Sequence, residues 1–155
     1  YAGQAVNPWL GNQYTEYGHD MEEAARLSYE METGVEVEQV AFIEDDQQRI
    51  LCSPDGLVGD TGLVEIKNLP KKHIYTLMYY DKHGKIPPDY RAQLQMQLYV
   101  TERDFVDMYY YSPLLPTLLV RVEPDQKMFD ALADQIEVVL KERDRIVAVL
   151  EKMSA

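Results

Sequence analysis

The sequence predicts an α/β fold in which helices flank a central mixed β-sheet. Short segments alternate between apolar and polar residues, as half-buried strands do, and longer segments repeat their apolar residues at helical spacing. Gly, Pro and Asp residues separate these segments, as they do in turns. The length of 155 residues corresponds to one domain, and 46% apolar residues are ordinary for a globular protein.

A helix is predicted near the start of the chain, before any strand. Residues 1–13 are polar and contain Gly, Asn and Pro, so we expect an irregular segment there. The helix follows Thr15, has acidic residues in its early turns and ends before Gly34. Glycine is the residue type that most commonly follows a helix C-terminus, so Gly34 is the expected cap.

Three strands are predicted after this helix. Residues 35–43 alternate as a strand does, a turn follows, and residues 49–53 form the returning strand. Residues 62–68, with the sequence GLVEIKN, form the third strand. The connection 56–62 is short and contains three glycines, which predicts a hairpin loop between the second and third strands.

The second half of the chain is predicted to alternate between helices and strands. Its expected elements are a helix over 71–80, a break over 82–88, a helix opened by Pro88 over 89–101, strands over 104–112 and 117–123, and a long amphipathic helix from Pro124. The complete order is therefore α-β-β-β-α-α-β-β-α, and periodicity alone does not set the order of the strands in the sheet.

Charge and cysteine content restrict the function classes. The net charge of −12 argues against nucleic acid as a partner, although a divalent cation can bridge carboxylate and phosphate groups. Cys52 is the single cysteine, which excludes an internal disulfide and any all-cysteine metal site, and is typical of a reducing cytoplasm. The apolar runs are too short and interrupted for a membrane span, so no membrane partner is expected.

The third strand contains two charged residues that share one face. Side chains alternate along a strand, so Glu65 and Lys67 point to one side while Val64 and Ile66 point to the other. The ordinary interpretation of this pattern is a solvated Glu–Lys face. The functional interpretation is a charged site at the edge of the sheet.

Asp55 favours the functional interpretation, although many Pro-Asp-Gly sequences are plain turns. The predicted hairpin places Asp55 beside the start or middle of the third strand, near Glu65. Two such carboxylates form a hard-oxygen site for Mg²⁺, with Mn²⁺ as a possible substitute, and the Ile66 backbone carbonyl can add an oxygen. Lys67 can then orient or deprotonate a water, or stabilise charge on a phosphate.

Two helices add polar residues to this candidate site. Glu22 and Glu23 lie in the middle of the first helix, where one of them can point towards the charged end of the sheet or both can be solvated. Gln93 and Gln97 are four residues apart and share one face of the later helix, while Gln95 lies elsewhere. Amide groups of this kind can hold a phosphate or a water without adding charge.

These motifs resemble the PD-(D/E)XK nuclease superfamily, and in detail the lambda-type phage exonucleases of the YqaJ-like viral recombinase family. The similarity runs from about Tyr17 to Tyr111. The motifs are G-x-x-x-E from Gly18 to Glu22, CSPDGL at 52–57, GLVEIKN at 62–68 and AQLQMQLYVT at 92–101. The resemblance implies a restriction-endonuclease-like core and a single nuclease domain over 1–155 that lacks an N-terminal segment.

The resemblance also implies roles for individual residues. Asp55, Glu65 and the Ile66 carbonyl would be metal ligands, and Lys67 would be the catalytic lysine. Glu22 would be the helix acid in catalysis and metal binding, preferred over Glu23 because it lies four residues after Gly18. Gln93 would be the motif glutamine near the attacking water or the phosphate.

The remaining expectations concern DNA and partners. Ser53 would lie near the scissile phosphate, and a basic lining for DNA has as its candidates Lys71, Lys72, His73 and Arg91. The implied activity is Mg²⁺-dependent 5′ to 3′ digestion of one strand at the ends of linear double-stranded DNA. The implied setting is a phage- or prophage-encoded homotrimer in the cytoplasm of a bacterial host, working in DNA recombination with a single-strand annealing protein.

Two other functions agree with the same residues. One is another PD-(D/E)XK nuclease, either a restriction-type endonuclease or a nuclease associated with a helicase. The other is a non-catalytic module that binds DNA or protein on the same fold, which the net charge of −12 favours. The presence of Asp55, Glu65 and Lys67 together argues for an enzyme.

Overall fold

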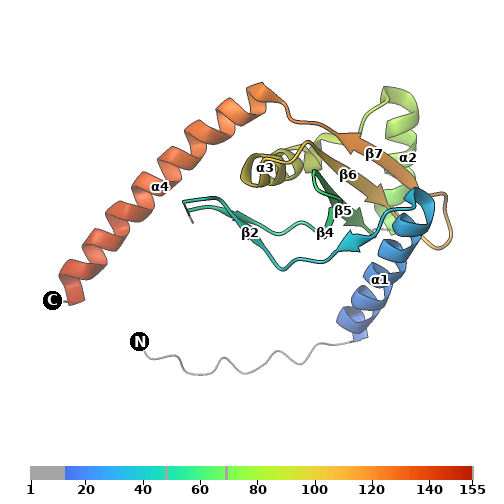
Figure 1. Ribbon diagram of the computed structural model, residues 1–155, viewed down its shortest axis with the longest axis horizontal. Coiled ribbons are helices and arrows are strands. Elements are labelled where there is room, and N and C mark those ends of the chain that lie inside the picture. The colour runs from blue at the N-terminus through green and yellow to red at the C-terminus, as the bar shows by residue number, and fades with distance from the viewer. Residues whose placement is uncertain (1–12, 48, 69, 155) are drawn as a thin grey trace.

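The structure is a computed structural model that describes residues 13–47, 49–68 and 70–154. Its centre is a five-stranded mixed sheet with the strand order β1-β4-β5-β6-β7, and a separate two-stranded sheet is formed by β2 and β3. Helices lie on both sides of the larger sheet (Figure 1). The predicted α/β class is therefore confirmed. Residues 1–12 of the segment expected to be irregular lie outside the described residues.

Helix α1 (Gln13–Thr33) covers one face of the larger sheet. Its Ala25 and Tyr29 are buried against apolar side chains that point to this face from β5 and β6, namely Val64, Ile66 and Tyr109. The helix ends as predicted, because Gly34 has a φ of +73° and its N–H donates to the Glu30 carbonyl at 2.8 Å.

The prediction of one continuous strand over 35–43 is wrong. The structure has β1 (Val37–Glu38) at the edge of the larger sheet, paired with β4, and β2 (Ile43–Glu44) in the smaller sheet, paired with β3 (Leu51–Cys52). Phe42 lies between them and is 57% exposed, so the alternating pattern does not mark one buried face. Residues 35–43 form two separate strands because β1 pairs with β4 while β2 pairs with β3.

The predicted loop 56–62 contains a strand of its own. Strand β4 (Gly56–Val58) pairs antiparallel with β5 (Gly62–Lys67), and Gly59 turns the chain between them with a φ of +56°. The hairpin partner of β5 is thus β4 rather than the strand over 49–53. Gly56 is required by close packing rather than by a turn, since a Cβ there would lie 2.2 Å from Val37 Cγ1.

The predicted order of elements in the second half of the chain is confirmed. These elements are α2 (Pro70–His83), the 3₁₀ helix η1 (Pro88–Tyr90), α3 (Arg91–Thr101), β6 (Phe105–Tyr110), β7 (Leu118–Val122) and α4 (Gln126–Ser154). Strand β6 runs parallel to β5 and antiparallel to β7. Helix α3 covers the second face of the sheet, where Leu94 and Leu98 pack against Leu63 of β5.

A buried acid joins β6, β7 and α1. Asp107 is 1% exposed, and its two carboxylate oxygens accept hydrogen bonds from Arg121 Nε and Nη2 at 2.8 and 2.9 Å. The Tyr29 hydroxyl donates to the same carboxylate at 2.9 Å, and the Arg121 guanidinium lies 3.6 Å from the centre of the Phe105 ring. The two donors compensate the cost of burying this charge.

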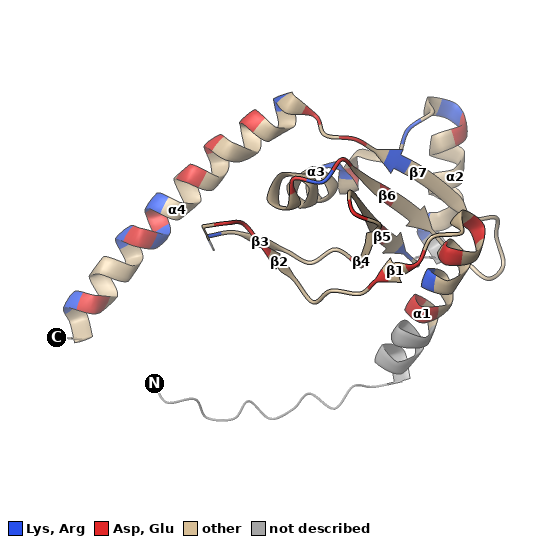
Figure 2. Ribbon diagram, viewed as in Figure 1, with Lys and Arg blue, Asp and Glu red and all other residues tan. Residues whose placement is uncertain are grey.

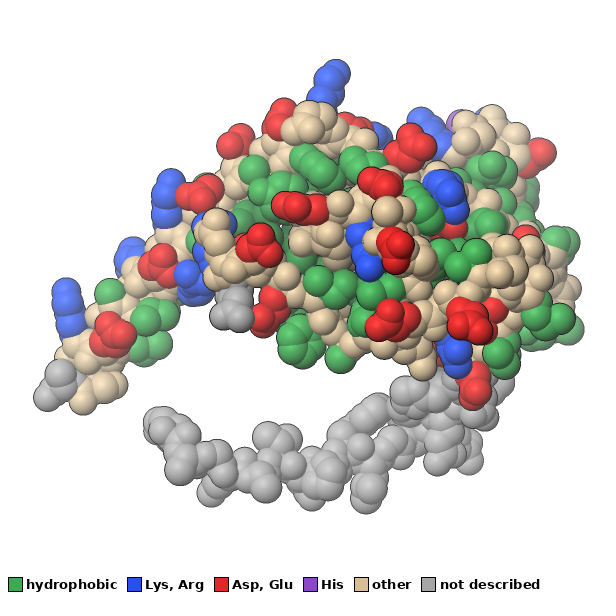
Figure 3. All heavy atoms as spheres, in the orientation of Figure 1, with side chains coloured by type: hydrophobic (Ala, Val, Ile, Leu, Met, Phe, Trp, Pro, Cys, Tyr) green, Lys and Arg blue, Asp and Glu red, His purple; other side chains and the backbone are tan. Residues whose placement is uncertain are grey.

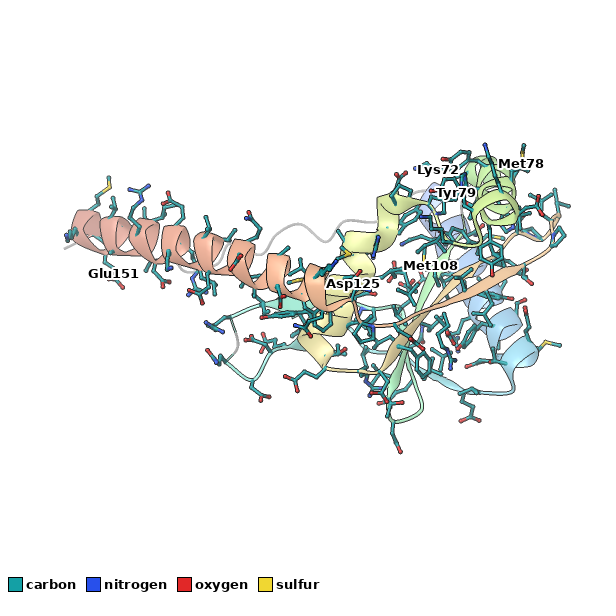
Figure 4. All side chains as sticks on the ribbon, turned by 90° about the horizontal axis from the view of Figure 1, so that it is seen from above. Lys72, Met78, Tyr79, Met108, Asp125 and Glu151 are labelled. Carbon is teal, nitrogen blue, oxygen red and sulfur yellow. The ribbon has the colours of Figure 1, made fainter. Side chains whose placement is uncertain are left out.

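Helix α4 begins against the domain and ends away from it. Phe129 near its start meets the ring of Tyr99 on α3 edge to face, at 5.4 Å between ring centres. Figure 4 shows Asp125 beside the domain and Glu151 near the far end of the projecting helix. None of the helices that the structure describes combines the length and the apolar composition needed to cross a lipid bilayer.

Candidate active site

The register of the β4–β5 hairpin places two acids opposite each other. Gly56 pairs with Val64 and Leu57 with Leu63, so one further step along the antiparallel register puts Asp55 opposite Glu65. Directly opposed residues of an antiparallel pair project to the same face. The Ile66 N–H donates to Asp55 Oδ2 at 2.6 Å, which holds Asp55 beside Glu65, as the sequence predicts.

Glu65 is buried and held by three side chains. It is 2% exposed, which rules out a solvated Glu–Lys face. Oε1 accepts hydrogen bonds from Lys67 Nζ and, at 2.6 Å, from Gln93 Nε2. Oε2 accepts one from Gln97 Nε2 at 2.7 Å. The four residues form one hydrogen-bonded cluster on the face that α3 covers.

Helix α3 presents two adjacent rows of side chains to this face. Leu94 and Leu98 form the apolar row that packs against Leu63, and Gln93 and Gln97 form the polar row, one position earlier, that reaches Glu65. Gln95 points elsewhere and binds the Glu123 carbonyl. The predicted pairing of Gln93 with Gln97 on one helix face is confirmed.

Gln97 belongs to the cluster, although the resemblance gave a role only to Gln93. Its side chain is buried, and its Oε1 has no hydrogen-bond partner among the described residues. Its spacing of four from Gln93 was the available signal, because residues at i and i+4 share a helix face. Its amide N–H therefore serves mainly to hold Glu65.

Burial and neighbouring charge disturb the ionisation of Asp55. Burial, followed by the negative charge of Glu65, raises the pKa of the Asp55 carboxyl to about 6. The Ile66 N–H and the Lys67 ammonium oppose this increase, and the carboxylate of Glu22 adds a smaller one. Asp55, Glu65 and Lys67 thus interact electrostatically as a single group.

Glu22 lies on the side of α1 that faces the sheet. It precedes the buried Ala25 by three residues and Tyr29 by seven, so it continues their stripe, whereas Glu23 does not. Its side chain is exposed, and its charge acts on Asp55 without a hydrogen bond among the described residues. The structure therefore brings Glu22, rather than Glu23, to the margin of the cluster.

The oxygen atoms of this cluster suit a Mg²⁺ ion. The Lys67 carbonyl accepts from the Tyr111 N–H of the chain leaving β6, so by strand alternation the carbonyl of Ile66 points to the opposite side, where Asp55 lies. An ionised carboxylate has about four lone pairs, of which Glu65 uses three and Asp55 one in the hydrogen bonds described. Lone pairs on both acids are thus left for a cation.

No three Asp, Glu, His or Cys side chains within the described residues meet in a group that by itself would hold a metal ion. Mg²⁺ does not need such a cage, because it commonly binds one or two carboxylates and completes its coordination with waters and substrate phosphates. The mutual repulsion that raises the pKa of Asp55 is a second reason for a cation here. The residues present therefore fit a Mg²⁺ ion shared with a phosphate.

Cys52 lies beside the cluster as a buried thiol. Burial, followed by the charge of Glu65, raises the pKa of the Cys52 thiol to about 11. A thiol of this pKa is almost wholly protonated at neutral pH and is a poor nucleophile. Cys52 is thus a small packed residue.

The residues expected to line a DNA path occupy different environments. The Ser53 hydroxyl donates to the Ala41 carbonyl at 2.6 Å, and Arg91 forms an ion pair with Asp125. Lys72 is exposed on α2 (Figure 4), while the side chain of Lys71 lies outside the described residues. Figure 2 shows that the described part of α1 carries mainly acids, whereas α4 carries both acidic and basic residues.

His73 does not belong to an exposed basic lining. It is 1% exposed, and its Nε2 lies 2.8 Å from the Pro116 carbonyl, to which the ring nitrogen donates. Its ring also meets the Tyr110 ring edge to face. The expectation that His73 faces DNA is wrong, because a tertiary contact holds the imidazole in the core.

A groove among the described residues lies away from the carboxylates. A groove of about 780 Å³ lies between the β2–β3 hairpin, the C-terminal half of α3 and the first half of α4. Its rim includes Glu44, Asp46, Glu102 and Asp104, and Arg49 crosses it to reach Glu137 at 3.8 Å. These acids would repel a phosphate backbone, so the candidate active site is defined by its buried acids instead.

Known proteins with the same arrangement were found by comparison. Residues 3–104 match the model of the YqaJ-like viral recombinase domain. Among curated proteins, none matches the chain by sequence.

Solved structures of exonucleases are also similar to this chain. LHK-Exo, an alkaline exonuclease from Laribacter hongkongensis, is 34% identical over 90% of this chain and 77% of its own, with a TM-score of 0.63. Its complex with dAMP matches at 33% identity over 91% and 77% of the two chains, also with a TM-score of 0.63. A phage-related exonuclease from Haemophilus somnus 129PT shares the fold, with a TM-score of 0.64 at 16% identity over 94% and 77%. By its sequence and its fold, the chain therefore belongs to the YqaJ-like viral recombinase domain family.

Proposed function

We propose that this protein is a Mg²⁺-dependent exonuclease that digests one strand of linear double-stranded DNA from the 5′ end. The observation that carries the proposal is the buried pair Asp55 and Glu65 with Lys67 on the same strand face, in a chain of the viral recombinase family. The similarity to alkaline exonucleases supports a nuclease over a binding module. We further propose that the protein acts with a single-strand annealing protein in phage-type recombination in the cytoplasm of a bacterial host.

Hydrolysis in this direction adds water across one phosphodiester bond. A water oxygen bonds to phosphorus, and the bond between phosphorus and the 3′ oxygen of the terminal nucleotide breaks. That 3′ oxygen takes up a proton, and the shortened strand keeps a 5′-phosphate. The dAMP bound to LHK-Exo is a nucleoside monophosphate, the class of product that this reaction releases.

The chain supplies several groups for this reaction. Lys67 Nζ donates one hydrogen bond to Glu65, which leaves two N–H groups for a phosphate oxygen or the attacking water. Gln93 uses its amide N–H on Glu65, so its Oε1 can accept a hydrogen from the same water. Asp55, Glu65 and the Ile66 carbonyl would hold Mg²⁺, which when bound supplies positive charge beside the scissile phosphate.

The proposal is tested with linear duplex DNA and covalently closed circular DNA, each with Mg²⁺ and with EDTA. We expect degradation of the linear duplex in Mg²⁺, with Mn²⁺ as a working substitute, and no cleavage in EDTA or of the closed circle. Labels placed separately at the 5′ and 3′ ends of one strand determine the direction of digestion.

Each other outcome identifies a different function. Cleavage of closed circles would replace the exonuclease by an endonuclease of the same superfamily. DNA binding without Mg²⁺-dependent cleavage of either substrate would replace the enzyme by a binding module. Release of the 3′ label first would reverse the proposed direction.

We also propose that the protein assembles as a homotrimer through the end of α4. The apolar residues of this segment lie on one face of the helix at i, i+1, i+3, i+4 and i+7, and all of them are exposed: Ile146, Val147, Val149, Leu150 and Met153. Figure 3 shows hydrophobic side chains on this projecting part of the molecule. An exposed apolar stripe of this length supports contact with a second copy of the chain.

Light scattering tests the assembly. The wild type is expected to have about three times the 18.0 kDa mass of one chain, and Ile146→Asp with Leu150→Asp is expected to reduce it to one. Lys152→Asp adds an acid outside the stripe and should leave the trimer intact. A monomeric wild type, or a trimeric double variant, would contradict this interface.

A further inference from the structure

The ammonium of Lys67 contacts both an acid and an aromatic ring. Nζ donates to Glu65 Oε1 and also lies over the Tyr90 ring, 5.4 Å from the ring centre. A cation within about 6 Å of a tyrosine ring centre is attracted by the negative face of the ring. The side chain of Lys67 is 19% exposed, so water screens this attraction only in part.

Tyr90 is itself held in place. It is the last residue of η1, after Pro87 and Pro88, whose rings restrict the backbone at the entry to α3. Its ring meets the Tyr110 ring edge to face, with 6.2 Å between ring centres and an interplanar angle of 67°. Tyr110 is the register partner of Lys67 on the neighbouring strand β6. The lysine and the residue that supports the Tyr90 ring therefore lie on adjacent strands.

The support continues into the core through His73. The Tyr110 ring meets His73 at 6.4 Å with an interplanar angle of 86°, and His73 is tied to the Pro116 carbonyl. Both side chains are buried. Tyr90 therefore has a fixed position, whereas a lysine side chain alone is long and flexible.

We propose that Tyr90 is a positioning residue that holds the Lys67 ammonium where it can donate to the scissile phosphate or the attacking water. This role rests on the proposed nuclease function. The ring attracts the ammonium without accepting any of its N–H groups, so two of them remain for the phosphate or the water. A third carboxylate at this place would attract Lys67 more strongly but would also repel the phosphate. The ring face, rather than the hydroxyl, supplies the interaction.

The role predicts a difference between two substitutions at the same position. Tyr90→Phe keeps the ring face and is expected to retain kcat within about twofold, while Tyr90→Leu is expected to lower kcat by about 5- to 30-fold. KM should change by less than about twofold in both, because the ring acts on the lysine and not on DNA binding. Tyr75→Leu removes an exposed tyrosine of α2 and is the control.

The contact also has a readout that needs no catalysis. Protons of the Lys67 Cε group, assigned by their absence in Lys67→Met, should resonate upfield from those of exposed lysines because of the ring current of Tyr90. The upfield shift is expected to persist in Tyr90→Phe and to disappear in Tyr90→Leu.

The outcomes separate this role from the proposed function. A wild type that hydrolyses no DNA would refute the proposed nuclease function and, with it, a role of Tyr90 in the chemical step. The upfield shift would still show whether the Tyr90 ring lies against Lys67. An active wild type with full kcat in Tyr90→Leu would refute the positioning role alone. A Tyr90→Phe variant as impaired as Tyr90→Leu would show that the hydroxyl, and not the ring face, is needed.

Discussion

Replacing Lys67 by methionine is expected to lower kcat for DNA hydrolysis by about 100- to 1000-fold, with DNA affinity changed only a few-fold. Methionine retains most of the apolar stem but removes the ammonium that contacts Glu65 and faces the Tyr90 ring. The charge that develops on the phosphate then loses a donor placed beside it. Single-turnover hydrolysis rates in Mg²⁺, with DNA binding measured separately in EDTA, check this result.

Loss of activity must be distinguished from loss of structure in this variant. Glu65 is buried, and without Lys67 its carboxylate keeps only the two amide donors Gln93 and Gln97, so the thermal midpoint should fall as well. Hydrolysis is therefore compared at a temperature where both proteins are folded. Lys82→Met, which removes an exposed lysine at the end of α2, is the matched control and should behave as wild type. Turnover of Lys67→Met at the wild-type rate would refute its catalytic role.

Asp55→Asn is expected to abolish activity and at the same time to stabilise the metal-free protein. The raised pKa of Asp55 means that its ionised form opposes folding, and one pKa unit corresponds to about 1.4 kcal/mol, so removing the charge should add about 1–3 kcal/mol at pH 7. Asparagine can still accept the Ile66 N–H through its side-chain oxygen. Mg²⁺ should stabilise the wild type but not this variant.

The stability difference between Asp55→Asn and the wild type should depend on pH. The folded-state pKa of about 6 lies above the ordinary pKa of 3.8 for an aspartate, so at pH 7 the ionised carboxyl destabilises the folded wild type. This destabilisation decreases as the pH falls below about 6 and the folded protein takes up the proton. The advantage of Asp55→Asn in urea unfolding should therefore shrink between pH 7 and pH 4.5. Asp60→Asn, at the exposed turn of the hairpin, is the control. A variant less stable than wild type in EDTA at pH 7 would contradict the interpretation.

Local periodicity was enough to predict the central parts of the fold. Strand β5 and helix α3 were predicted because their patterns of two and of about 3.6 residues are long and regular. The same patterns correctly assigned Glu65 and Lys67 to one strand face, and Gln93 with Gln97 to one helix face. In both elements, the local period alone shows which side chains share the face that carries the site.

Strand β4 could not be predicted in the same way. Its three residues begin with Gly56 and are followed by Gly59, so their local sequence is that of a loop. They form a strand because β5 and β1 supply hydrogen-bonding partners on both sides. The prediction still placed Asp55 near Glu65, because any short connection returns the chain to the same edge.

Residues whose roles depend on distant partners were also assigned wrongly or missed. His73, expected to face DNA, is a core residue through Pro116, which lies 43 positions away. The ion pair of Arg91 with Asp125, 34 positions away, is also absent from the local pattern, and the role of Arg91 in DNA binding stays a prediction. Tyr90 faces Lys67 only because β6 brings Tyr110 behind it. No pattern within a short window of sequence contains these pairings.

The two rows of side chains on α3 tie the stability of the core to the accuracy of the site. Leu94 and Leu98 determine how the helix is rotated on the sheet, and the same rotation aims Gln93 and Gln97 at Glu65. A substitution at either leucine that turns the helix by a few degrees would move both amides together. A search for more thermostable variants at these two positions would therefore select, unintentionally, for slower enzymes.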